Sequence, residues 1–227
     1  MTTSQPPLAA EIEPVREVSL LGLADRAPWV ALLEKEGLTP ADCEGKAQFM
    51  LTASDSVFKG IPFREFAVSV KATATHGDPE AEGYYLVHAF NSLRVFAFVE
   101  RAVFHTPYYH AAVSVETRLP ASVRVTRGET PLFHAEMAAD STPRELLRDA
   151  VGGFRGPIFL PGGRLFYATI EGQTQAYAFD PTRDVAVFTP TSREPLLKGL
   201  RDSGFQGKEW QIRSSARHAK SRTVRRG

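Results

Sequence analysis

The sequence predicts a mainly β protein of the α+β class, in which antiparallel strands close into a barrel flanked by a few short peripheral helices. Apolar and polar residues alternate with period two from Phe63 onward, as is typical of strands that bury one face. Short segments rich in Gly, Asp and Pro separate these stretches, and short connections favour antiparallel neighbours. About nine strands result, more than an open twisted sheet carries comfortably, so closure is expected.

The N-terminal part precedes this alternation. Residues 1–25 are expected to form a weakly ordered arm, and residues 26–207 a single barrel domain. The segment APWVALLEKEG, at 27–37, predicts a short helix that ends at glycine. The segment TPAD, at 39–42, predicts the start of a second helix.

The strands of the barrel follow from the alternation and from the turn residues between them. They are expected near 64–74, 83–91, 93–101, 109–117, 121–127, 131–138, 164–171, 173–180 and 184–189. The capping-box pattern TPRE, at 142–145, predicts a helix through Ala150 that ends at Gly152. Glu171 and Gly172 predict a turn, and residues 195–200 a last helix.

The net charge of +1 hides an uneven distribution. Residues 208–227 carry seven Lys and Arg side chains against Glu209 alone, a charge of +6, so residues 1–207 carry −5. A basic, serine-containing end on an acidic body predicts a disordered, solvated tail. Nucleic acid is not favoured as a partner, because charge patterning alone supplies no specific contact.

Several protein classes are disfavoured by composition. No apolar run approaches the roughly 18 residues of a membrane span, and the first residues lack the basic end and apolar block of a signal peptide. A cytoplasmic location without membrane partners is therefore expected. The single Cys43 cannot form an internal disulfide and has no cysteine neighbours for a thiolate metal site. Neither a cofactor nor a metal is expected.

Two short segments carry a family resemblance. The segment GIPFREFAVSV, at 60–70, and the segment FHTPYY, at 104–109, together resemble the acetoacetate decarboxylase-like superfamily, especially its uncharacterised bacterial branch. The resemblance implies a closed antiparallel β-barrel with a central pocket, often in oligomers. In the decarboxylases of this superfamily, an aromatic-x-Glu motif places a carboxylate in the pocket. Phe63-Arg64-Glu65 matches that motif and nominates Glu65.

The second family motif departs from the pattern. The decarboxylases carry two lysines after a proline, and the first forms a Schiff base with the keto acid. Here Tyr108 and Tyr109 follow Pro107, and a phenol cannot form an imine. The resemblance therefore implies no Schiff-base decarboxylation, and we expect a pocket reached by a carboxylate and a phenol but by no primary amine.

Glu65 is the first candidate for acid–base chemistry. It shares strand parity with Phe63 and Ala67, so on an inward face it is a buried carboxylate that needs a partner, for which Arg94 is favoured. A raised pKa would suit a general acid or base. A plain Glu–Arg pair in the barrel wall is the alternative.

The other candidates surround the proline corner. His105 is a candidate acid or base, and His88, Arg94 and His110 are candidate ligand contacts, although His88 also fits a hydrogen-bonded core residue. Strand parity turns one of Tyr108 and Tyr109 inward, either to contact a ligand or to plug the cavity.

Three functions remain open. The favoured one is a small-molecule-binding barrel for a small organic acid or carbonyl compound, without Schiff-base decarboxylase activity. The second is a lyase, hydratase or cyclase in which Glu65 or His105 moves a proton. The third is an interaction protein that binds nucleic acid through its basic tail.

Overall fold

The structure, a computed structural model, describes residues 7–75, 82–139, 144–189 and 194–226. Its strands are β1 (Leu8–Asp25), β2 (Leu38–Pro40), β3 (Asp42–Cys43), β4 (Lys46–Phe58), β5 (Ile61–Ala74), β6 (Glu82–Asn91), β7 (Tyr108–His110), β8 (Ala112–Glu116), β9 (Ser122–Arg127), β10 (Thr130–Glu136), β11 (Leu146–Leu160), β12 (Arg164–Ala178), β13 (Val185–Phe188), β14 (Gln206–Ser221) and β15 (Val224–Arg225). Its helices are α1 (Ala27–Glu34), α2 (Arg94–Val103) and α3 (Pro195–Asp202). The predicted class, mainly β with few helices, is confirmed.

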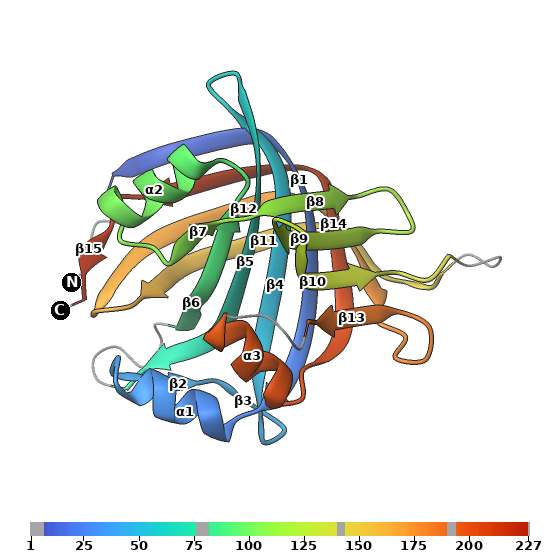
Figure 1. Cartoon of the computed structure of the whole chain (residues 1–227), viewed down its shortest axis with the longest axis horizontal. Coiled ribbons are helices and arrows are strands. Elements are labelled where there is room, and N and C mark those ends of the chain that lie inside the picture. Colours follow the sequence, from blue (N-terminus) through green and yellow to red (C-terminus); the bar gives the residue numbers. More distant parts are fainter. Residues whose placement is uncertain (1–6, 76–81, 140–143, 190–193, 227) are drawn as a thin grey trace.

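The strands form one large and one small sheet (Figure 1). In the 11-stranded sheet, hydrogen-bonded neighbours follow the order β5-β4-β1-β14-β12-β11-β6, and β6 pairs again with β5, so the ladders form a ring. The expectation of purely antiparallel pairing is wrong for two pairings, both of which involve β6. Strand β6 runs parallel to β11, through Tyr84 opposite Ile158 and Tyr85 opposite Phe159, and it also runs parallel to β7.

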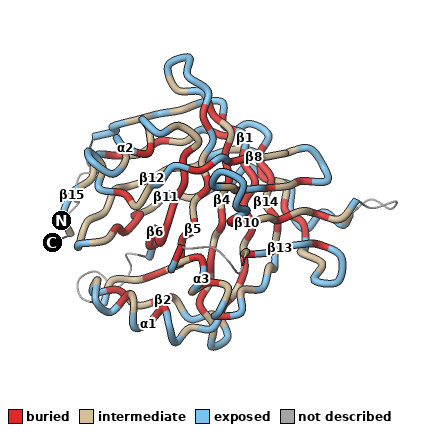
Figure 2. Tube along the Cα trace, in the orientation of Figure 1, coloured by how far each residue is buried: buried red, intermediate tan, exposed pale blue. Residues whose placement is uncertain are grey.

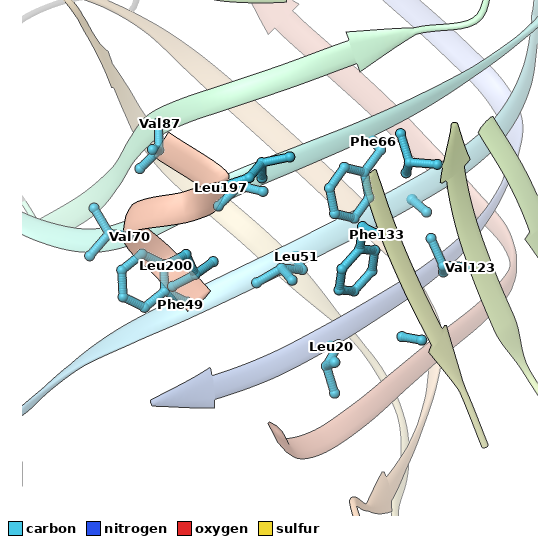
Figure 3. Packing of buried hydrophobic residues seen from close by; sticks show 14 of the residues in the cluster. Leu20, Phe49, Leu51, Phe66, Val70, Val87, Val123, Phe133, Leu197 and Leu200 are labelled. Carbon is cyan, nitrogen blue, oxygen red and sulfur yellow. The ribbon is translucent and has the colours of Figure 1, made fainter. Parts of the chain in front are cut away.

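The larger hydrophobic core lies between the two sheets. Phe66 of β5 stacks on Phe133 of β10 with ring centroids 4.9 Å apart, and Leu197 and Leu200 of α3 belong to the same cluster (Figure 3). An aromatic pair of this kind contributes about 1 kcal/mol beyond its buried area. The small sheet β13-β10-β9-β8 therefore covers the outside of the ring, and buried residues are concentrated where it does so (Figure 2).

The inner face of the ring is less completely filled. A smaller cluster, which includes Leu86, Ala89 and Leu160, packs inside it. Helix α2 covers one side, where Phe96 contacts Phe63 with ring centroids 5.1 Å apart. The part of the ring interior that this cluster leaves open is the cavity described below.

Both ends of the described chain are strands, which corrects the expected arm and the expected tail. Strand β1 lies between β4 and β14, and β14 lies between β1 and β12. Val18 in β1 and Trp210 in β14 are completely buried. The charges after residue 207 suggested disorder, whereas β1 and β14 are stabilised by pairing with each other, some 200 residues apart in the chain.

Two local predictions between residues 39 and 103 are corrected, and one strand in this region was missed. Residues 93–101, predicted as a strand, belong mostly to helix α2. The apolar residues of this segment fit a strand as well as an amphipathic helix, and the helix buries Ala97. The helix start predicted at 39–42 is the short strand β2 followed by β3, and the long strand β4 was not predicted.

Two further corrections concern β11 and β12. Leu146 and Ala150, expected in a helix, lie in β11, while residues 142 and 143 of the capping box lie outside the described residues. The turn predicted at Gly172 is absent, because β12 continues through it. A Cβ atom there would lie 2.8 Å from the backbone oxygen of Ser215, so glycine permits a close strand approach.

Candidate active-site cavity

A cavity of about 360 Å³ opens inside the ring and is lined mainly by apolar side chains. On β5 every second residue from Phe63 to Ser69 lines it, as the strand period requires. Strands β4, β12 and β14 and helix α2 supply most of the rest. The volume lies in the range of small-molecule sites.

Glu65 lies in this cavity and is partly exposed to it. The Asn91 side-chain amide donates a hydrogen bond of 2.9 Å to its Oε1. Burial, followed by the Glu100 charge, raises the pKa of Glu65 to about 7. Lys220 and the hydrogen bond from Asn91 lower the pKa but offset only part of this rise. A carboxyl group of this kind exchanges protons near neutral pH.

Tyr108 of β7 also lines the cavity, with its phenol close enough to Glu65 for that carboxyl group to affect its pKa. Burial, followed by the negative charges of Glu65 and Glu100, raises the Tyr108 pKa well above its usual value. The phenol therefore stays protonated and remains a hydrogen-bond donor. Tyr109, its neighbour, turns away: 39% of its surface is exposed, and its ring stacks on His88 outside the cavity.

Lys220 of β14 overturns the expectation that no primary amine reaches the pocket. Its ammonium group pairs with Glu100 of α2, and Nζ lies 4.0 Å from the centroid of the Phe104 ring. Thr106 donates a hydrogen bond of 3.0 Å to the other oxygen of Glu100. Sequence reasoning missed Lys220 because it assigned residues 208–227 to a disordered tail.

A second polar group that sequence reasoning also missed, formed by His218 and Glu17, lies at the back of the cavity. His218, two residues before Lys220 and on the same face of β14, lines the cavity, and its Nε2 lies 2.7 Å from Oε2 of Glu17. Arg213 pairs with the other oxygen of Glu17 and also donates a hydrogen bond of 2.8 Å to the Thr174 hydroxyl. Glu17 is completely buried.

The remaining predicted residues lie elsewhere. Arg94 is exposed at the first turn of α2 and does not line the cavity, so the cation near Glu65 is Lys220 instead. His105 and His110 are both exposed and do not line it either. His105 has a positive φ of 56°, which suits a turn.

His88 belongs to a separate buried cluster outside the cavity lining. Its Nε2 lies 3.2 Å from Glu194 Oε2, and burial together with the Arg127 charge lowers the His88 pKa to about 4. His88 is therefore a buried residue that stacks on Tyr109, although within the described residues its Nε2 makes no hydrogen bond of the kind expected for a hydrogen-bonded core residue.

The described ranges contain no group of three His, Cys, Asp or Glu side chains arranged to hold a metal ion. They also contain no helix that is long and apolar enough to cross a membrane.

Comparison with known proteins defines the fold. No family model and no curated protein matches the sequence. Among solved structures, an acetoacetate decarboxylase-like enzyme from Sphingomonas wittichii RW1 is 15% identical with a TM-score of 0.59, covering 99% of this chain and 94% of that one. Acetoacetate decarboxylase from Legionella pneumophila is 13% identical with a TM-score of 0.63, covering 99% and 90%.

A third similar structure is the enduracididine biosynthesis enzyme MppR, complexed with the condensation product of pyruvate and imidazole 4-carboxaldehyde. It is 11% identical with a TM-score of 0.65, covering 98% of this chain and 90% of that one. The chain therefore has the fold of the acetoacetate decarboxylase-like proteins. At these identities the likeness concerns the fold, and the chemistry has to be argued from the side chains of the cavity.

Proposed function

We propose that the protein binds a small organic acid or carbonyl compound in the cavity of the ring, which we take to be a closed barrel. One observation carries this proposal: a phenol and a carboxyl group with a pKa near 7 share an otherwise mainly apolar cavity with an ammonium group. A few convergent polar groups on apolar walls are typical of small-molecule sites.

The polar groups suit the two ends of such a ligand. Lys220 attracts a ligand carboxylate, which competes with Glu100 for the ammonium group. Below pH 7, Glu65 is mostly protonated and, like Tyr108, is able to donate a hydrogen bond to a carbonyl oxygen. The pyruvate complex of MppR, which has the same fold, is consistent with this class of ligand.

Thermal unfolding in the presence of candidate ligands tests the proposal. Pyruvate, acetoacetate, hydroxy acids and aromatic acids are added at millimolar concentrations. A ligand at ten times its Kd stabilises the folded state by about 1.4 kcal/mol, which raises the Tm of a domain of this size by about 3–6 °C. The absence of any shift across the whole series would overturn the proposal.

A matched pair of variants locates the binding site. Lys220→Met removes the cavity ammonium group and should weaken binding of an active acid at least 10-fold. Lys198→Met is the control, because Lys198 is an exposed residue of α3 with a weak pair to Asp202 at 3.9 Å. Equal affinities for the two variants would place the acid elsewhere.

We propose further that Lys220 does not form a Schiff base. The Lys220 ammonium group is paired with Glu100 and lies over the Phe104 ring, and an ammonium group has no lone pair to attack a carbonyl carbon. Borohydride reduction with pyruvate or acetoacetate should leave the intact mass unchanged. A stable adduct that disappears in Lys220→Met would contradict this.

The second candidate function is acid–base catalysis without an imine, for instance by a lyase, hydratase or cyclase. The pKa of Glu65 near 7 favours it, since such a group is poised to give or take a proton at neutral pH. His105, the other residue considered for this role, is exposed and outside the cavity lining. Turnover of any substrate that persisted in Glu65→Gln would exclude this role for Glu65.

A further inference from the structure

His218 and Glu17 form a buried contact at the back of the cavity. Nε2 of His218 and Oε2 of Glu17 lie 2.7 Å apart. Both atoms are buried, and within the described residues neither makes a hydrogen bond of good geometry, so their contact is a close ion-pair approach. Each atom therefore depends on the other for its polar contact.

Glu17 is held rigidly and in its charged form. Its Oε1 receives Arg213 and a hydrogen bond of 3.1 Å from the Ser19 hydroxyl, which in turn lies 3.0 Å from the Thr52 hydroxyl. Burial alone would raise the pKa of Glu17, but the close contact with His218 and the His218 and Arg213 charges outweigh it and lower the pKa to about 2. A fixed carboxylate therefore faces the imidazole at all ordinary pH values.

A fixed carboxylate determines which ring nitrogen carries the proton. An ionised carboxylate oxygen 2.7 Å away would repel the lone pair of an unprotonated nitrogen, so Nε2 of His218 carries the hydrogen. In the neutral ring this leaves the lone pair on Nδ1. The His218 side chain is 24% exposed and lines the cavity, although its Nε2 is buried, so Nδ1 is the nitrogen left for a ligand.

The groups that face His218 complete the arrangement. Glu17 and Arg213 lie behind it, Lys220 lies beside it on β14, and Glu65 on β5 is close enough for the His218 charge to lower its pKa. A ligand in the cavity is thus within reach of a base on β14 and of the donors Tyr108 and protonated Glu65.

We propose that His218 is a second acid–base group of this cavity and that Glu17 is the residue that positions it. The inference rests on the proposed binding of carbonyl compounds. Nδ1 takes a proton from the carbon next to the carbonyl group. The electron pair of that C–H bond moves through the enolate to the carbonyl oxygen, where Tyr108 or Glu65 donates a hydrogen bond. Return of a proton from His218 regenerates the ligand, so no co-reactant is required.

Nitrogen NMR of the ¹⁵N-labelled full chain tests the positioning by Glu17 without any ligand. At a pH at which the ring is neutral, we expect a protonated Nε2 and an unprotonated Nδ1. Glu17→Gln should mix or reverse the two tautomers. Glu11→Gln is the matched control, since Glu11 pairs with Arg217 across the same two strands but on the exposed face. An Nδ1-protonated ring in the wild-type protein, or an unchanged tautomer in Glu17→Gln, would overturn the role of Glu17.

Hydrogen–deuterium exchange at the methyl groups of pyruvate and acetoacetate tests the acid–base role. We expect catalysed exchange by the wild-type protein, a loss of at least about 100-fold in His218→Ala and a smaller loss in Glu17→Gln. The Glu11→Gln control should match the wild type. Absence of exchange with both compounds overturns the acid–base role, whether or not they bind, and thermal shifts report separately on the proposed binding.

Glu17→Gln leaves a buried Arg213 without its carboxylate and risks misfolding. The double variant Glu17→Gln with Arg213→Met removes both charges and serves as the second test. It should show the same mixed tautomer and the same loss of exchange as Glu17→Gln. Wild-type tautomer and exchange in the folded double variant would contradict the proposal.

Discussion

At the scale of single residues, Glu65 shows what a strand pattern predicts and what it does not. Its parity with Phe63 and Ala67 predicts the face on which it lies, and the structure places it in the cavity lining with both. The strand pattern does not predict the charged partners of Glu65. Arg94 is near in sequence but exposed, whereas Lys220 and Glu100 come from two separate elements. Strand parity depends only on the local sequence, whereas charge partners depend on which strands and helices lie side by side in the fold.

The raised pKa of Glu65 makes a prediction about stability. A folded-state pKa of about 7, against 4.5 in the unfolded chain, means that the folded state binds the proton more tightly. The contribution is complete below about pH 4.5 and is lost as the pH rises through 7. Between these values, the free energy of unfolding of the wild type should fall by up to about 3 kcal/mol relative to Glu65→Gln.

Urea unfolding of both proteins at several pH values between 4.5 and 8 measures this difference. Glu129→Gln, in the exposed turn between β9 and β10, is the control and should run parallel to the wild type. A constant difference between wild type and Glu65→Gln across this range would show that burial does not hold the proton on Glu65.

At the scale of elements, the predictions succeed where one strand face is buried and short turns follow. Strands β5, β6, β9, β10 and β13 and helices α1 and α3 lie close to the predicted ranges. The errors fall where the pattern is ambiguous. Helix α2 has the sequence RVFAFVERAV, in which apolar residues satisfy a period of two as well as a helical period, so burial of Ala97 against the ring decides.

Helix α2 covers the cavity mainly through Phe96, which contacts Phe58 and Phe63 with ring centroids 6.4 and 5.1 Å apart. Phe96→Ala should lower the free energy of unfolding by about 1–3 kcal/mol, less than for a fully buried Phe. Amide hydrogen exchange in α2 should accelerate more than in β4 or β5, since the helix loses its anchor to the sheet.

Phe98→Ala is the matched control on the same helix. Phe98 is 61% exposed, so its removal should change stability by less than about 0.5 kcal/mol and leave exchange in α2 unchanged. Equal effects of the two substitutions would show that α2 is not held over the cavity by Phe96.

At the scale of the whole molecule, the uneven charge of the sequence reflects pairing within the chain. Arg213, Arg217 and Lys220 of β14 pair with Glu17, Glu11 and Glu100 of the preceding part. Three of the seven basic side chains of residues 208–227 are therefore paired with carboxylates of the fold. Sequence reasoning missed this because a charge run shows no partner until the strand order is known.

The same pairing predicts how truncations behave. Strand β14 joins β1 to β12, and Trp210 within it is completely buried. Deletion of residues 206–227 opens the ring at two ladders and removes His218 and Lys220. We expect a chain without a cooperative thermal transition, measured by circular dichroism, because the exposed edges and the lost core exceed the few kcal/mol of a domain's net stability.

Deletion of residues 223–227 is the matched control. It removes β15, whose pairing with β12 involves only Leu165 and Arg164, together with the hydrogen bond from Arg226 to Gly163. This shorter chain should fold, with a Tm lower by several degrees, because only a few hydrogen bonds of about 1 kcal/mol each are lost. A cooperative, native-like transition after removal of residues 206–227 would mean that β14 is the dispensable tail suggested by its charge, and the cavity built on His218 and Lys220 would then lose its structural basis.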